Sequence, residues 1–163
     1  EGERLCGILL GDVGHHDRII RDDITSGIIP FHKLSQWMAY SLIEPLQEAG
    51  MNVVELDTLT GLAEYRNGGL FIDTHVLTLK DSRMLAVAHD PKSPLVVEWR
   101  GLTVALLDKV AAAVRAHTGD DAESLPLASV LQGGTWTAGR RIAKQLRADG
   151  SPPIVLDSKG TIF

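Results

Sequence analysis

Apolar residues recur at three- and four-residue spacing in the stretch 28–50, which is the spacing of one face of an α-helix. Gly50 follows the last of them and is a typical helix stop. Pro45 lies inside the pattern and is expected to kink the helix, because proline removes one backbone donor. The positions that form this amphipathic face are Phe31, Leu34, Trp37, Met38, Ser41, Leu42 and Leu46.

The stretch 93–119 carries the clearest helical pattern of the chain. Ser93 can cap its start, Pro94 suits the first helical position, and Gly119 ends it. The predicted apolar stripe is formed by Leu95, Trp99, Leu102, Leu106, Val110 and Val114.

A last helix is predicted over residues 127–146. Gly133, Gly134 and Gly139 weaken it, which predicts close packing or a break near residue 133. "LCGILLGDV" fits a strand or a buried helical turn, and periodicity does not decide between helix and strand for "GGLFIDTHVLTLKD". The tail is expected to form a small hairpin or two short strands around residues 157–160. The pattern predicts a mainly α fold with a few short strands.

Composition narrows the class of protein. The chain has 163 residues, 44% of them apolar and 23% charged, which fits a single globular domain. A net charge of −5 argues against a nucleic-acid binder. The only cysteine, Cys6, excludes an internal disulfide, and no apolar run is long enough for a membrane span. We expect a cytoplasmic protein.

Six histidines raise the question of a metal site. His15 and His16 are adjacent and Asp17 follows, but no spacing typical of zinc or calcium ligands occurs. We therefore expect neither a metal nor another cofactor.

The segment "EYRNGG" places Glu64, Tyr65, Arg66 and Asn67 between apolar flanks. Buried charges are costly unless they are paired. One interpretation is a buried ion pair that pins a turn, with Gly68 and Gly69 supplying positive backbone angles. The other is a pocket carboxylate held ionised beside cations. The segment by itself does not choose between them.

Further charged residues occur at the starts of the two long helices. Lys33 lies between apolar residues in the first turn of the first helix, and Glu98 and Arg100 flank Trp99. Each fits a solvated helix surface, and each also fits a binding site.

Several longer motifs resemble those of a known family. The segments "FHKLSQWMAYSLIEPL", "LTGLAEYRNGGLFID", "VVEWRGLTVALLDKV" and "LASVLQGGTWTAGRRIA", with a closing "GTIF", are similar to the uracil-catabolism protein family of fungi and bacteria, a domain of unknown function. The resemblance covers residues 29–163. Members of that family are longer than this chain, so the resemblance implies that this chain is the C-terminal portion of such a protein. It also implies a role in a pathway that opens the pyrimidine ring of a uracil nucleotide, with ribosylurea-type compounds and urea downstream.

A more distant resemblance is to the queuosine-salvage N-glycosidases, whose helical fold is similar to that of DNA glycosylases. Their motifs Phe-Tyr-Lys-Arg-Ala-Gln, Ala-Asp-Tyr-Arg and Glu-Ile-Arg correspond here to "FHKLSQ", "AEYRNGG" and "EWRGLT". The resemblance places Lys33 at the active-site lysine and Glu64 at the catalytic aspartate. Glutamate replaces aspartate, Asn-Gly-Gly follows the arginine, and one residue is missing from the interval, which leaves substrate and fine geometry open.

Together these features predict a hydrolase of a ribosylurea or a pyrimidine-derived nucleoside or nucleotide. A carboxylate stabilises the positive charge that develops on the sugar when an N-glycosidic bond breaks. Glu64 and Lys33 are the predicted catalytic residues, and Lys33 is expected to keep Glu64 ionised. An arginine, Arg66 or Arg100, suits a 5′-phosphate. The predicted substrate-binding residues are Arg66, Asn67, Tyr65, Trp37, Glu98 and Arg100. The alternative is a ligand-binding or scaffold domain without activity, and a DNA-directed glycosylase is disfavoured by the charge.

Overall fold

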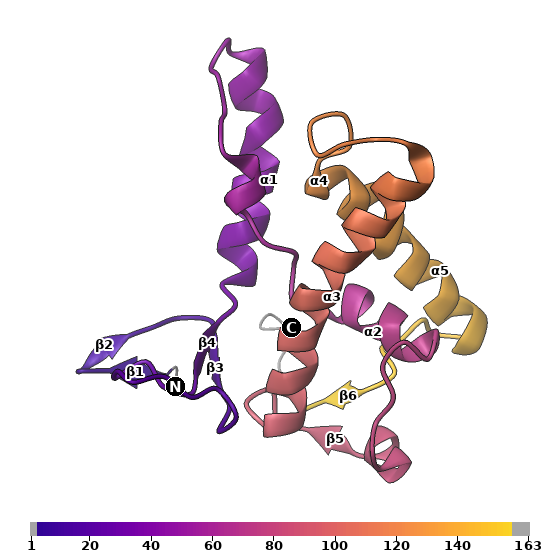
Figure 1. Cartoon of the computed structure of the whole chain (residues 1–163). Coiled ribbons are helices and arrows are strands. Elements are labelled where there is room, and N and C mark those ends of the chain that lie inside the picture. Colours follow the sequence, from indigo (N-terminus) through magenta and orange to yellow (C-terminus); the bar gives the residue numbers. More distant parts are fainter. Residues whose placement is uncertain (1–2, 158–163) are drawn as a thin grey trace.

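The longest helix, α3 (Pro94–Thr118), runs through the middle of the computed structural model, which describes residues 3–157 (Figure 1). Val97, Trp99 and Leu107 of α3 each belong to a different cluster of buried apolar side chains. The predicted bounds of this helix are confirmed, and Gly119 ends it with a left-handed φ of 82°. Ser93 precedes the helix but makes no side-chain capping bond.

The buried face of α3 is rotated from the predicted stripe. Trp99 is buried as expected, whereas Leu102 is 41% exposed. The face turned to the core also includes polar residues that an apolar pattern cannot identify. Its buried members are Val96, Val97, Trp99, Arg100, Thr103, Leu107 and Ala111.

A second layer packs against α3. In the segment that periodicity left undecided, residues 68–73 belong to helix α2 (Tyr65–Asp73), and residues 74–81 form neither helix nor strand. The predicted last helix is continuous through α4 (Leu127–Ser129), a π-helical segment (Val130–Trp136) and α5 (Thr137–Leu146). Contacts among α2, α3 and this last helix build the core, so the predicted mainly α fold is confirmed.

The glycines of the last helix have two different roles. An added Cβ at Gly139 would overlap the carbonyl oxygen of Arg66, so this glycine lets α5 lie directly against α2. Gly133 and Gly134 have open space where a Cβ would be. The helix does not break near residue 133. It widens to π-helical geometry there.

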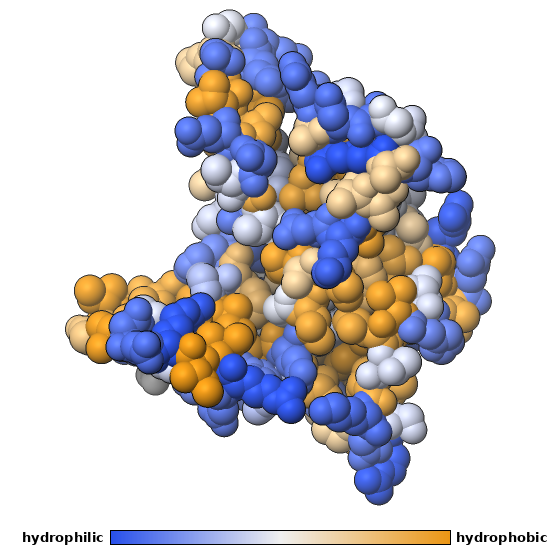
Figure 2. Space-filling model, viewed as in Figure 1, coloured by the Kyte–Doolittle hydropathy of each residue, from blue (hydrophilic) through white to orange (hydrophobic). Residues whose placement is uncertain are grey.

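Helix α1 (Lys33–Glu48) projects from the rest of the molecule (Figure 1). It begins later than the amphipathic pattern, because residues 28–30 form strand β4 (Ile28–Pro30). The helix passes Pro45 and ends three residues later, and none of its residues is buried. Apolar residues are visible on this projecting region in Figure 2. The exposed large apolar residues of α1 itself are Leu34, Trp37, Met38 and Leu42.

The described strands are short and form three pairs. Strand β1 (Arg4–Leu5) is antiparallel to β2 (Ile8–Leu9), and β3 (Val13–His15) is antiparallel to β4. Strand β5 (Ala88–His89) is parallel to β6 (Val155–Leu156), which places Ile154 in the core. The hairpin predicted around residues 157–160 lies almost entirely outside the described residues.

Candidate functional site

A pocket of about 460 Å³ lies between the projecting helix α1, the start of α2 and the last helix. Lys33 and Glu64 both line it, although 31 positions separate them in the chain. Its wall combines aromatic, aliphatic and polar side chains. The lining residues are Lys33, Trp37, Tyr40, Ser41, Glu44, Leu62, Glu64, Asn67, Ala128, Leu131, Gln132 and Trp136.

Glu64 is the N-terminal cap of α2. Its backbone is extended, and its two carboxylate oxygens accept hydrogen bonds from the backbone N–H groups of Arg66 (2.9 Å) and Asn67 (2.6 Å). These groups are free donors at a helix start, where the helix dipole also favours a negative charge. The residue is only 7% exposed. The first turn of α2 therefore holds a buried carboxylate in one orientation at the pocket wall.

Burial raises the pKa of the Glu64 carboxyl above its ordinary value, because the charged form loses solvation. The backbone N–H groups of Arg66 and Asn67 and the charges of Arg66 and Lys33 act in the opposite direction but do not outweigh it. As predicted, the charge of Lys33 lowers the pKa of Glu64. The prediction is incomplete, because burial raises that pKa by more. Glu64 is a stronger base than an exposed glutamate.

Lys33 is placed by the end of β4 and by Asp12. Its backbone N–H donates to Oδ2 of Asp12 over 3.0 Å, which anchors the first turn of α1. Burial and the nearby charge of Arg100 lower the pKa of Lys33, while Glu64 and Asp12 act to raise it. The pKa of the half-buried Lys33 is therefore influenced by two cations, Arg100 and Arg66, and by the two carboxylates.

Arg100 is buried in an ion pair and does not line the pocket. Its guanidinium donates two hydrogen bonds of 2.8 Å to the carboxylate of Asp12 and lies over the ring of Phe31. Although burial alone would raise the pKa of Asp12, the hydrogen bonds and charge of Arg100 lower it overall. This pair ties the β3–β4 region to α3 behind Lys33.

The remaining predicted binding residues divide into two groups. Trp37 and Asn67 line the pocket. Tyr65 and Arg66 line a different pocket on the other side of the α2 start. Glu98 lies outside both pockets, 47% exposed, near His16 and Arg18.

Asn67 is buried and its side chain is held at both ends. Its amide N–H donates to the carbonyl of Leu62, and its amide oxygen accepts a 2.8 Å hydrogen bond from the hydroxyl of Thr135. These contacts join α2 to the π-helical segment. Asn67 therefore shapes the pocket wall as part of a fixed network.

The structure separates the two interpretations of the "EYRNGG" segment. Arg66 does not form an ion pair with Glu64 among the described residues, since its guanidinium lies over the rings of Tyr65 (4.7 Å) and Trp136 (4.9 Å). Gly68 and Gly69 do not supply positive backbone angles, because both lie inside α2. The idea of an ion pair that pins a glycine turn is therefore wrong.

The two glycines instead permit close packing. An added Cβ at Gly68 would approach Thr103 and the indole of Trp99 to less than 3 Å, and at Gly69 it would lie 3.0 Å from Pro153. The indole N–H of Trp99 donates to the carbonyl of Gly68 over 3.0 Å. The absence of a side chain at Gly68 lets α2 lie close against α3, and its absence at Gly69 leaves room for Pro153.

Sequence reasoning missed several residues of the pocket wall. Trp136 comes from the "GGTWTAG" segment, where a lone tryptophan among small residues was the available signal. Tyr40 donates its hydroxyl to the carbonyl of Thr60, and burial raises its pKa to about 12, so it remains a neutral phenol. Glu44 and Gln132 add polar groups whose roles no local pattern indicates.

Within residues 3–157, no group of three or more histidine, cysteine, aspartate or glutamate side chains is placed to hold a metal ion. None of the helices in that range combines the length and the apolar character needed to cross a membrane.

The fold and the site define a mainly α-helical protein with a buried capping carboxylate and a lysine at one pocket. The chain belongs to the family described as "Protein of unknown function (DUF1688)", whose model matches residues 1–163. It is similar to "Protein urg3" of Schizosaccharomyces pombe, with 48% identity over 83% of this chain. It is also similar to "Uracil catabolism protein 4" of Lachancea kluyveri, with 41% identity over 87% of this chain.

The chain spans only about a third of these relatives, 35% of the first and 36% of the second. No solved structure matches the chain. The predicted membership of a uracil-catabolism family is confirmed. The likeness to queuosine-salvage N-glycosidases stays a prediction.

Proposed function

We propose that this chain carries the site of an N-glycosidase-like hydrolase in uracil degradation, acting in the cytoplasm without a metal or organic cofactor. Its substrate is a ribosylurea or another pyrimidine-derived nucleoside or nucleotide. The observation that carries the proposal is that Glu64 and Lys33 line one concave pocket of about 460 Å³. The name of the Lachancea kluyveri relative, "Uracil catabolism protein 4", supports a role in this pathway.

The geometry supports a defined role for Glu64. When the bond between ribose and the urea-like nitrogen breaks, positive charge builds at the anomeric carbon. The Glu64 carboxylate, fixed by two backbone N–H groups, stabilises this charge. Because its pKa is raised, the same carboxylate can also take a proton from the attacking water.

Lys33 and the aromatic residues have supporting roles in this proposal. The ammonium of Lys33 donates to the leaving group or to a ribose hydroxyl, because it faces the same pocket. Trp37 and Trp136 offer flat surfaces for a ring or ureido plane. Water attacks as the C–N bond breaks, and the products are the ribose compound and urea or the corresponding base.

The test is to incubate the chain with ribosylurea and with ribosylurea 5′-phosphate and to measure urea release. The full-length relative from Lachancea kluyveri is assayed in parallel, because this chain spans only 36% of it. We expect urea release by the wild-type protein and loss of that release in the Glu64→Gln variant. Release that is undiminished in that variant would overturn the assignment of Glu64.

A specific observation also favours a second candidate, a ligand-binding or scaffold domain without activity. Helix α1 exposes Leu34, Trp37, Met38 and Leu42 and buries none of its residues. Exposed apolar groups of this kind are typical of interaction surfaces. In that case pocket ligands bind to the wild-type chain and to Glu64→Gln without being cleaved by either.

A further inference from the structure

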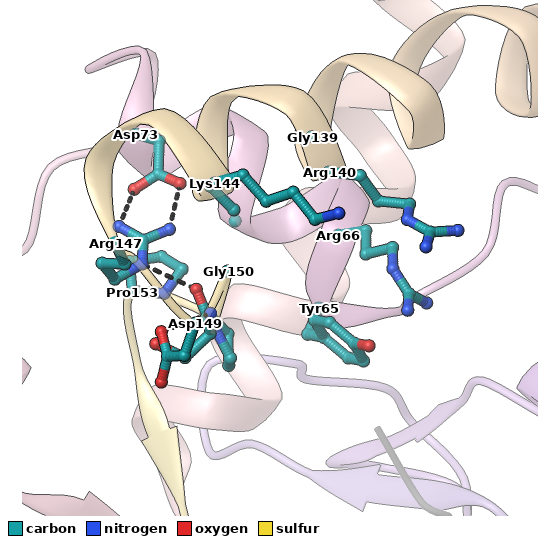
Figure 3. Close-up of a pocket in the computed structure, with 14 residues that line it drawn as sticks. Tyr65, Arg66, Asp73, Gly139, Arg140, Lys144, Arg147, Asp149, Gly150 and Pro153 are labelled. Carbon is teal, nitrogen blue, oxygen red and sulfur yellow. Dashed lines mark hydrogen bonds and ion pairs between the residues drawn. The ribbon is translucent and has the colours of Figure 1, made fainter.

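A second pocket, of about 200 Å³, lies between the start of α2, helix α5 and the segment after it (Figure 3). Four cationic residues line it, namely Arg66, Arg140, Lys144 and Arg147, against two carboxylates, Asp73 and Asp149. This local excess of positive charge contrasts with the net charge of −5 for the chain.

The carboxylates do not neutralise all of these cations. Arg147 is paired with Asp73 through hydrogen bonds of 2.8 and 2.5 Å, and its Nε donates to the carbonyl of Ser151. In the part of the chain that the structure describes, Arg66, Arg140 and Lys144 have no carboxylate within 4.0 Å. In Figure 3 the charged ends of these three side chains lie on the side of the view away from Asp149 and Arg147.

The packing of α2 against α5 holds these cations together. Gly139 lets α5 contact the backbone of Arg66, which brings the next residue, Arg140, beside Arg66. Both guanidinium groups lie over the ring of Trp136, each 4.9 Å from its centroid. Such stacking fixes the orientation of an arginine and leaves its N–H groups available. Like charges held this close repel one another, and a bound anion relieves that repulsion.

We propose that this second pocket binds the phosphoryl group of a phosphate monoester through Arg66, Arg140 and Lys144. Planar guanidinium groups match phosphate oxygens in pairs, and an ammonium adds a point charge. The ligand has two conceivable sources. It is either the 5′-phosphate of a molecule that also reaches the Glu64 pocket past Trp136, which lines that pocket, or a separate phosphorylated metabolite.

The test is calorimetric titration of the chain with ribose 5-phosphate, with ribose as the uncharged comparison. Arg140→Gln and Lys144→Gln remove exposed cations of the pocket, so both variants should fold. Arg141→Gln is the matched control, because Arg141 is an exposed neighbour outside the pocket. We expect a dissociation constant of about 1 mM or tighter for ribose 5-phosphate, weakened about tenfold in each pocket variant and unchanged in the control.

Equal binding of ribose and ribose 5-phosphate, or equal weakening by Arg141→Gln, would overturn the proposal. Because the experiment measures binding, the proposal of a phosphate site is tested independently of hydrolysis at Glu64. A further arm identifies the source of the phosphate. If Arg140→Gln raises the KM for ribosylurea 5′-phosphate but not for ribosylurea, the phosphate belongs to the substrate. If neither KM changes while ribose 5-phosphate binding weakens, the site serves a separate metabolite.

Discussion

The Oε1 atom of Glu64 accepts a 2.6 Å hydrogen bond from the backbone N–H of Asn67, so the proposed catalytic carboxylate is also the cap of α2. One side chain thereby satisfies two of the free donors of a helix start and presents its charge to the pocket. The orientation of the carboxylate is determined by the backbone. Variants of Glu64 must therefore separate loss of charge from loss of the cap.

The first prediction concerns Glu64→Gln. The amide oxygen can still accept one capping bond, so we expect a loss of stability of only about 1 kcal/mol. The negative charge is gone, so urea release should fall about 100-fold or more. Urea denaturation and the hydrolysis assay measure the two effects. Glu48→Gln, at the exposed end of α1, is the control and should change neither.

The second prediction concerns pH. Burial raises the pKa of Glu64 above its ordinary value of 4.5, so kcat/KM should increase with pH along an acidic limb centred above 4.5. The charge of Lys33 lowers that pKa, so Lys33→Gln should move the limb to higher pH. A pH–rate profile of both proteins measures the shift. The same limb in both proteins, or a similar shift in the exposed-site control Lys80→Gln, would contradict this role of Lys33.

The third prediction concerns the pair of Asp12 and Arg100. Asp12→Asn removes the carboxylate that pairs with the guanidinium of Arg100, whose side chain is 2% exposed, which should reduce the free energy of unfolding by about 3 kcal/mol. Asp12 has a lowered pKa, so its stabilisation is complete above its unfolded value of 3.8 and is lost as pH falls through the folded value. The difference between wild type and variant should therefore shrink in acid.

Urea denaturation at neutral and acidic pH checks this prediction. The exposed pair of Asp81 and Arg83 provides the control, because solvent screens it. Arg83→Gln should leave the unfolding midpoint nearly unchanged. Equal losses in both variants would show that burial of Arg100 is not the cause.

The fourth prediction compares two glycines of the same helix. Gly139→Ala places a Cβ against the carbonyl oxygen of Arg66, so the helices must separate and the protein should lose about 1–3 kcal/mol. Gly133→Ala meets open space and replaces a poor helix former, so it should gain about 0.5–1 kcal/mol. Thermal unfolding of both variants measures these opposite signs. A loss at residue 133 would contradict the prediction.

Local patterns were sufficient for the elements with a repeating signal. The spacing of apolar residues and the Pro94 and Gly119 signals predicted α3 with its bounds, because helix geometry and capping are local properties. The amphipathic pattern before Lys33 failed as a helix, since Ile28–Pro30 pair with the distant strand β3. The predicted amphipathic helix is present as α1, yet none of the residues of α1 is buried.

For the site, the sequence by itself determined that Lys33 and Glu64 were candidates, through residue type and resemblance to known motifs. Only the tertiary structure decided which candidates share a pocket. Lys33, Glu64 and Trp37 line one cavity, and Arg66 lines a second. Arg100 is hydrogen-bonded to Asp12 instead. The physical reason is that burial, ion pairing and pocket walls arise from helices packed across long chain separations, as when Gly139 brings α5 onto Arg66.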